Sequence, residues 1–259
     1  MSSIEVLQER LILLKLNTLA NQIDGHLDQA GREEPPYADF LDQLLLTELN
    51  AKHLQRYHRR IQEARFPFQR TVDQFDFAFQ PSIPERQLRD LLTLRFVHQA
   101  ENVLFLGPPG VGKTHLSVAL GLEAITQGFS VLFVRVHDMI MDLTQAHREG
   151  HVVQRLKTYT RPKLLICDEL GYLTMDEVGA SLFFQLISAR YEHGATILTS
   201  NKSFGEWNHI FGETVIATAI LDRLLHHAHT FNIRGDSYRL RERRKAGTMP
   251  VSSPHLDPS

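Results

Sequence analysis

One eight-residue segment constrains the fold of this chain more than any other part of its sequence. It directly follows the apolar run VLFL (103–106) and consists of Gly107, Pro108, Pro109, Gly110, Val111, Gly112, Lys113 and Thr114. This order matches the pattern G-x-x-x-x-G-K-[ST], in which a loop joins a buried strand to the N-terminus of a helix. The glycines allow backbone N–H groups to turn inward around an anion. The segment therefore predicts a phosphate-binding loop at the carboxyl end of a strand.

The residue types of this loop indicate a nucleoside triphosphate as its ligand. Inward-facing N–H groups and the positive end of the following helix attract phosphate oxygens, and Lys113 adds a point charge for the β- and γ-phosphates. The hydroxyl of Thr114 is a ligand for Mg²⁺. We therefore expect ATP and Mg²⁺ as cofactors, and we add the adjacent His115 to the expected nucleotide-binding residues.

A second apolar segment, LLICDE (164–169), supplies the acids that a magnesium triphosphate requires. We expect Asp168 to hold Mg²⁺ and Glu169 to act as the base for the attacking water. An ordinary strand that ends in solvated acids would have the same sequence, but the loop upstream favours the catalytic interpretation. The acids are expected on a strand adjacent to the one that precedes the loop.

The segment ATILTSN (195–201) also ends in a polar residue, Asn201. From a neighbouring strand, its side chain could contact the γ-phosphate or the lytic water. Asparagine at a strand end is also a common turn residue. The segment alone leaves both interpretations open.

Apolar runs alternate with helical patterns along the middle of the chain. The expected strands are 103–106, 130–136, 163–169 and 195–201. The expected crossover helices begin at Lys113, His137 and Asp176. This alternation predicts an α/β fold with a central parallel sheet covered by helices on both faces.

Leucines at helical spacing precede this region and predict two amphipathic helices. Their apolar residues are Ile4, Leu7, Leu11 and Leu14 in the first helix and Phe40, Leu44, Leu45 and Leu49 in the second. We expect a helical N-terminal domain over 1–66 for assembly or for contact with DNA or a partner, a linker over 67–84, an ATPase domain over 85–246 and a disordered tail over 247–259.

Composition excludes several classes of protein. The chain has 28 Lys and Arg residues against 30 Asp and Glu residues, so a contact with nucleic acid must come from local basic patches. Cys167 is the only cysteine, which excludes an internal disulfide framework and fits a reducing cytoplasm.

The N-terminal segment does not read as a signal peptide, and no apolar run reaches membrane-spanning length. His226, His227 and His229 lack a carboxylate at fixed spacing, so no metal site is expected there.

Four segments of the chain resemble a known family. GPPGVGKTHL, LLICDELGYL, ILTSNKSFGEW and ILDRLLHHAHTFNIRGDSYRLRERR are similar to the IstB-type ATP-binding helper proteins of bacterial insertion sequences, which are AAA+ proteins. The resemblance spans nearly the whole chain. DnaC-type helicase loaders share the ATPase core, whereas the LGY after the acids and the SYR near the C-terminus favour the transposition branch.

The resemblance assigns roles to three polar residues. It implies that Asn201 is the sensor-1 residue, that Arg223 is an arginine finger reaching a neighbouring subunit, and that Arg239 is the sensor-2 residue of the same subunit. A guanidinium is suited to stabilising charge on a transferring phosphoryl group. The alternative for Arg223 is a surface arginine paired with Asp222, and for Arg239 it is membership of a solvated basic run.

The resemblance also implies partners. Subunits of the family assemble on duplex DNA in a helical or ring-shaped oligomer and recruit and stimulate a separate transposase. DNA phosphates would then be contacted by exposed cations. The expected contacts are Arg148, Arg155 and Lys157 first, then Lys52, Arg56, Arg59 and Arg60, with the C-terminal run 239–245 as a third stretch. Any one of these residues is equally well explained as part of a solvated helix face.

Three other functions are considered. A replicative helicase loader would bind a helicase and prefer single-stranded DNA. A small-molecule P-loop kinase would move label from ATP to a metabolite instead of to free phosphate, and it would usually carry a lid and substrate-binding arginines. Nuclease or strand-transfer chemistry is not expected in this chain, because its acids are explained by helix faces and by the ATP site.

Overall fold

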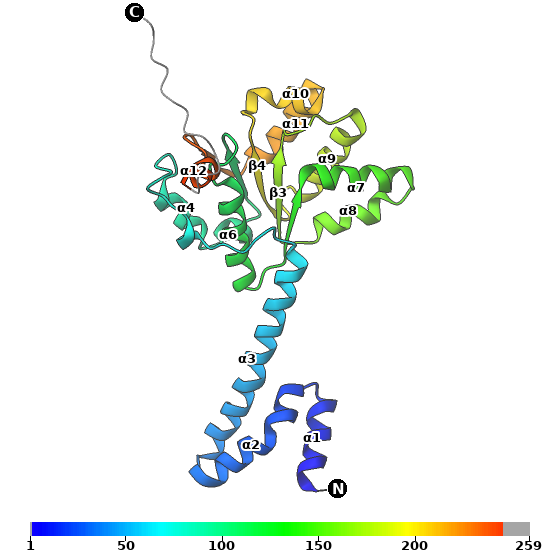
Figure 1. Cartoon of the computed structure of the whole chain (residues 1–259). Helices are drawn as coiled ribbons and strands as arrows, with labels where there is room; N and C mark the ends of the chain where they lie inside the picture. The colour runs from blue at the N-terminus through cyan, green and yellow to red at the C-terminus, as the bar shows by residue number, and fades with distance from the viewer. Residues whose placement is uncertain (1, 246–259) are drawn as a thin grey trace, which may run out of the picture. The chain divides into compact units, whose positions relative to one another are not determined.

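The computed structural model describes residues 2–245 (Figure 1). The chain divides into two compact units, and the boundary falls after Arg60. The expected tail, 247–259, lies outside the described residues. None of the helices between residues 2 and 245 has both the length and the apolar character that crossing a bilayer requires.

The N-terminal unit is built from α1 (Ser3–Leu13), α2 (Asn17–Glu33) and most of α3 (Tyr37–Ala64). The sequence predicted α1 and α3, and both are confirmed. It missed α2, although Leu19, Ile23 and Leu27 follow a four-residue step there. The core of the unit consists of Leu11, Leu19, Ala20, Ile23 and Leu44.

A buried glutamate of α3 caps the N-terminus of α2. Glu48 of α3 is 4% exposed and accepts a hydrogen bond from the backbone N–H of Leu19 at 2.8 Å. Lys52 lies 3.5 Å from the same carboxylate. No side chain of α2 itself caps this end of the helix, so Glu48 takes the place of an N-cap residue.

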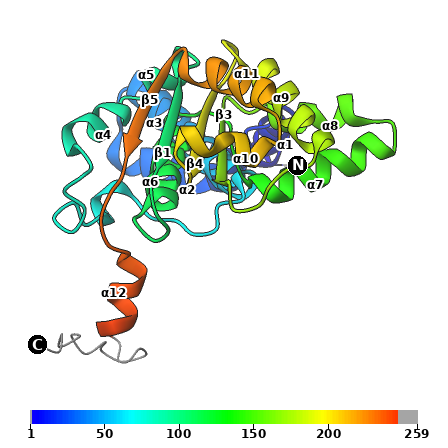
Figure 2. The same cartoon turned by 90° about the horizontal axis from the view of Figure 1, so that it is seen from above.

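The second unit contains a five-stranded parallel sheet in the order β2-β3-β4-β1-β5. Its strands are β1 (Asn102–Leu106), β2 (Val131–Arg135), β3 (Leu164–Leu170), β4 (Ala195–Ser200) and β5 (Ala228–Asn232). The expected α/β class is confirmed, and β5 is an additional strand. It escaped detection because its five residues include only one buried side chain, Phe231. Figure 2 shows that β5 leads into the segment that carries α12 (Tyr238–Lys245).

The expectation that the acids lie on the strand next to the loop strand is wrong. β4 lies between β1, which precedes the loop, and β3, which carries the acids. The helix α9 (Glu177–Arg190) returns the chain so that β4 inserts between the two. Asn201 directly follows β4. This residue therefore comes from the strand that borders both the loop strand, β1, and the acid-bearing strand, β3.

Helices cover both faces of the sheet (Figure 1). α6 (Lys113–Thr126) packs on β2, β3 and β4 from one side. The other side holds α7 (Val136–Arg148), α8 (Val152–Thr160), α9, α10 (Trp207–Phe211) and α11 (Thr214–Leu225), which share one apolar cluster with the inner residues of the strands. The remaining elements are the short helices η1 (Val72–Gln74), α4 (Glu85–Leu91), α5 (Arg95–His98) and η2 (Phe204–Glu206).

A buried arginine forms hydrogen bonds with several backbone segments on this side of the sheet. Arg190, the last residue of α9, is 2% exposed, and burial lowers its pKa to about 10. Its guanidinium donates hydrogen bonds to the carbonyl oxygens of Tyr159, Pro162 and Ala195 at 2.8, 3.0 and 2.6 Å. One side chain thus donates hydrogen bonds to carbonyl groups at the end of α8, in the segment before β3 and at the start of β4.

Replacing Arg190 with alanine is expected to lower the free energy of unfolding by about 3–5 kcal/mol, because several buried carbonyl groups lose their donor at once. Urea unfolding followed by circular dichroism measures this change. Arg161→Ala removes an exposed arginine nearby and is the matched control, with an expected change within about 0.5 kcal/mol. Equal effects of the two substitutions would contradict this role for Arg190.

Candidate nucleotide-binding site

The phosphate-binding loop has the backbone that its glycines predict. Gly110 and Gly112 have φ angles of +84° and +98°, and Gly112 is the N-cap of α6. A Cβ atom at Gly110 would overlap the hydroxyl of Ser237, and one at Gly112 would overlap the ring of Phe75. Both positions therefore need glycine for conformation and for space.

The side chain of Lys113 packs against the backbone of the phosphate-binding loop. Its side chain is nearly buried, and Nζ donates hydrogen bonds to the carbonyl oxygens of Gly107 and Pro108 at 2.6 and 2.8 Å. Burial lowers its pKa to about 8, although the negative charges of Asp168 and Glu169 oppose the shift. The groups that accept hydrogen bonds from this buried ammonium group are neutral carbonyls, and phosphate oxygens would be charged acceptors in their place.

Asp168 lies at the centre of a hydroxyl cluster. It is 3% exposed, accepts hydrogen bonds from Thr199 Oγ1 at 2.6 Å and Thr114 Oγ1 at 3.1 Å, and has a pKa raised by burial. Oxygen ligands of this kind fit Mg²⁺, and Thr114 and Asp168 are the residues that would hold it. Bound to a triphosphate, the ion would neutralise charge on the β- and γ-phosphates. The sequence predicted both residues but missed Thr199, whose register opposite the acids depends on the pairing of β4 with β3.

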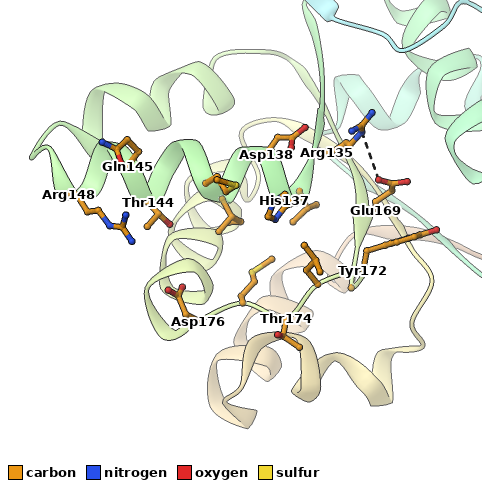
Figure 3. A pocket seen from close by; sticks show the side chains of 16 residues that line it. Arg135, His137, Asp138, Thr144, Gln145, Arg148, Glu169, Tyr172, Thr174 and Asp176 are labelled. Carbon is orange, nitrogen blue, oxygen red and sulfur yellow. Dashed lines mark ion pairs between the residues drawn. The ribbon is translucent and has the colours of Figure 1, made fainter.

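Glu169 leaves the line of β3 at a break in strand register between Cys167 and Leu170. Its φ angle is +64°, and its backbone N–H donates to Thr199 Oγ1 at 2.9 Å. This backbone turns the carboxylate toward solvent, where Oε2 lies 4.0 Å from Nε of Arg135 (Figure 3). A base at this position can reach a water molecule, and its cation partner is a residue that the sequence did not single out.

The glutamate and its partner belong to a pocket beside α7 (Figure 3). The loop 171–176 forms the opposite wall, where Tyr172 contributes its ring. The pKa of Tyr172 is raised by burial and by the charges of Glu169 and Asp168, and Arg239 lowers it in part. Arg239 is exposed near the start of α12, and the N–H of the preceding residue, Tyr238, donates to the carbonyl oxygen of Gly110 at 3.0 Å.

Asn201 has an unmet hydrogen-bonding requirement. Its Oδ1 is buried, and no side chain or backbone group among residues 2–245 donates to it. A buried carbonyl oxygen without a donor is unfavourable, so a partner from outside the chain is expected. A water molecule would be such a donor, and the sensor role of Asn201 stays a prediction.

Arg223 lies in the last turn of α11. Its guanidinium lies 4.7 Å from the ring centroid of Phe184, and Nη1 donates to the carbonyl oxygen of Ala219 at 3.1 Å. The structure therefore groups Lys113, Thr114 and the acids into one site and leaves Arg223 on α11, stacked on α9.

His115 contacts the segment that the sequence predicted as a linker. Its Nε2 lies 2.9 Å from the carbonyl oxygen of Thr71, and its ring packs edge-on against Phe75. Burial lowers the pKa of His115. In this structure the residue fixes the 67–84 segment against α6, and its contact with nucleotide stays a prediction.

The expected DNA contacts differ in their surroundings. Arg148 and Lys157 are exposed at the end of α7 and on α8, whereas Arg155 lies 3.4 Å from Asp142. In the N-terminal unit, Lys52 pairs with Glu48. The other N-terminal candidates on α3 are Arg56 and Arg59, which are exposed, and Arg60, which is half-buried.

Known proteins are similar to this chain in sequence or in fold. The family model described as IstB-like ATP binding protein matches residues 9–246. Proteins named for ATP binding in insertion sequences IS5376 of Geobacillus stearothermophilus and IS21 of Pseudomonas aeruginosa are each 46% identical to the chain, over 89% and 99% of its length and 92% and 97% of theirs. The solved structure of DnaI has a TM-score of 0.57 at 21% identity, over 67% of this chain and 93% of DnaI, and that likeness concerns the fold alone.

Proposed function

The chain belongs to the IstB-like ATP binding protein family, and on that premise we propose that it hydrolyses ATP on duplex DNA to assist the transposition of an insertion sequence. It is an insertion-sequence ATP-binding protein with the AAA+ P-loop fold. In the proposal, ATP-bound subunits assemble on target DNA in the bacterial cytoplasm and recruit and stimulate a separate transposase.

The observation that carries the hydrolytic step is the arrangement at the end of β3. Asp168 is bonded to Thr114, while Glu169 is turned away from the strand and remains half-exposed. One residue can thus hold Mg²⁺ while the next activates water. Asn201 supplies the buried acceptor that would orient this water.

The proposal that subunits act together rests on Arg223. A site that transfers a phosphoryl group to water needs a cation near the γ-phosphate in addition to Lys113 and Mg²⁺. Arg223 stacks on α9 and makes no contact with Lys113, Thr114 or the acids of its own unit. We assign it to the ATP site of a neighbouring subunit, which makes the oligomer the active species.

Binding to duplex DNA is proposed through α7 and α8. The double substitution Arg148→Ala, Lys157→Ala is expected to weaken binding of a duplex and to reduce the slope of log K against log salt by about 2, because each lost phosphate contact removes about 0.9 from the slope. Arg155 is left in place because it pairs with Asp142. Fluorescence anisotropy over a range of salt concentrations measures both quantities.

Arg86→Ala, on the exposed side of α4, is the matched control and should leave the slope unchanged. An unchanged slope in the double variant would contradict the assignment of α7 and α8. A helicase loader, the alternative function, would bind single-stranded DNA more tightly than duplex and would capture a helicase and no transposase from a cell extract.

A further inference from the structure

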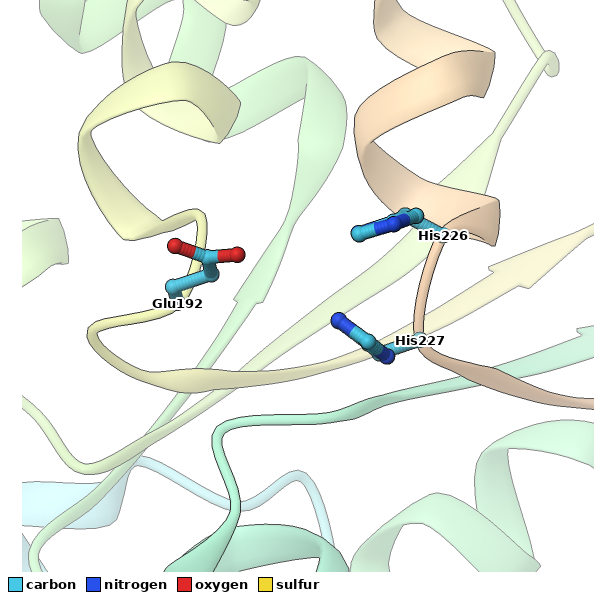
Figure 4. Close-up of side chains that lie close together, drawn as sticks. All are labelled: Glu192, His226 and His227. Carbon is cyan, nitrogen blue, oxygen red and sulfur yellow. The ribbon is translucent and has the colours of Figure 1, made fainter.

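Three metal-ligating side chains meet at the edge of the sheet opposite the phosphate-binding loop. Glu192 lies in the turn that precedes β4, and His226 and His227 lie directly before β5. The parallel strands β4 and β5 flank β1, so these turns are neighbours at the amino ends of the strands. One ligand atom from each side chain lies within 4.8 Å of the other two, and the three side chains point toward one another (Figure 4).

We propose that Glu192, His226 and His227 bind a zinc-class divalent transition metal ion. Two imidazole nitrogens and one carboxylate oxygen are ligands that Zn²⁺ accepts in a tetrahedral site, with water in the fourth position. Bonds of about 2.0–2.1 Å place neighbouring tetrahedral ligands roughly 3.4 Å apart. All three side chains are exposed, so rotation about their own bonds can close the remaining gap without moving the core.

The surroundings of the cluster favour a defined site over a chance encounter of surface groups. The hydroxyl of Tyr191 lies 2.7 Å from Nδ1 of His226, which orients the ring and leaves Nε2 for the metal. A polar partner on the second ring nitrogen is the usual companion of a metal-bound histidine. The rings of His226 and His227 lie 4.1 Å apart, so both imidazoles face the same space.

The backbone that carries the ligands is also fixed. Glu192 has a φ angle of +59° in a turn whose next two N–H groups, those of His193 and Gly194, donate to the carbonyl oxygen of Arg190. Arg190 is itself buried and donates hydrogen bonds to five backbone carbonyl groups. On the other side, the N–H of His226 donates to the carbonyl oxygen of Asp222 at the end of α11. Little backbone ordering is therefore required when a metal binds.

The third histidine of the sequence cluster does not belong to the site. His229 points to Glu101, with Nε2 and Oε2 3.0 Å apart. A metal site is not predictable here from the sequence alone, because Glu192 is remote from the histidines along the chain. A bound ion would join the turn before β4 to the end of α11, one helical turn beyond Arg223.

Isothermal titration of Zn²⁺ into tag-free, metal-stripped full-length protein tests the site. Saturating Mg²⁺ and ADP are included to occupy the site at Thr114 and Asp168. We expect one equivalent of Zn²⁺ to bind, and the affinity of His227→Ala and Glu192→Gln to fall at least about 10-fold, since each loses a direct ligand. With Co²⁺ in place of Zn²⁺, the absorption spectrum of a tetrahedral ion should appear in the wild-type protein and be lost in both variants.

His229→Ala is the matched control, because it removes a nearby histidine that pairs with Glu101 and should bind Zn²⁺ as the wild type does. All three substitutions are at partly or fully exposed positions, and circular dichroism confirms that each variant is folded. Absence of Zn²⁺ binding to the wild type, or equal affinity in His227→Ala and His229→Ala, would overturn the proposal. Neither outcome bears on the proposed ATP hydrolysis, which uses a different edge of the sheet.

Discussion

Substituting Lys113 with alanine is expected to lower the affinity for ATP at least about 100-fold, because the variant loses a charge-assisted hydrogen bond in a nearly buried loop. The ammonium group is already held in place by the carbonyl oxygens of Gly107 and Pro108. Calorimetric titration of ATP in the presence of Mg²⁺ measures the loss. Lys163→Ala, which removes an exposed lysine before β3, is the matched control.

The pH dependence of ATP binding follows from the same residue. The pKa of Lys113 in the nucleotide-free protein is about 8, so the group becomes neutral as the pH rises from 7 to 9. Bound triphosphate favours the protonated form, and binding above pH 8 must therefore take up a proton. We expect the affinity for ATP to fall over this range in the wild type and to be flat in Lys113→Ala. A Lys113→Ala variant that binds ATP as the wild type does would contradict the assignment of the loop.

Substituting Arg223 with alanine is expected to reduce the rate of ATP hydrolysis by about 1,000-fold or more while ATP affinity changes little. The arginine is proposed to act on the transition state in the adjacent subunit, so its loss should affect turnover and spare ground-state binding. Phosphate release in the presence of duplex DNA measures the rate. Glu169→Gln is expected to show the same phenotype for a different reason, since it removes the base in the subunit that holds the ATP.

Mixing the two inactive proteins tests whether Arg223 acts between subunits. An Arg223→Ala subunit keeps Glu169, and a neighbouring Glu169→Gln subunit keeps Arg223, so their interface contains one complete site. A random equal mixture should recover about one quarter of the wild-type rate if assembly is unaffected. Mixtures that stay as inactive as the two separate variants, or full activity of Arg223→Ala alone, would contradict a role between subunits.

The sequence predicted those parts of the site whose geometry is local. The phosphate-binding loop follows from glycines and a lysine at fixed spacing, and its positive φ angles at Gly110 and Gly112 are the conformations that glycine permits. Asp168 and Glu169 were placed at a strand end because the apolar run before them has the length of a buried strand.

The parts that the sequence missed depend on how strands pair. β4 inserts between β1 and β3, which brings Thr199 to Asp168, and β2 pairs with β3, which brings Arg135 to Glu169. The positive φ angle of Glu169 arises from an irregular register and has no signature in its own residue type. The short strand β5 was missed because a single buried side chain gives no periodic pattern.

If ATP is hydrolysed at a site completed by a second subunit on DNA, the rate of hydrolysis per chain depends on protein concentration. A dilution series with and without duplex DNA measures this dependence. This rate is expected to be low in dilute protein without DNA and to rise steeply with concentration and with added duplex. A rate per chain that is the same at every concentration, with and without duplex DNA, would contradict it.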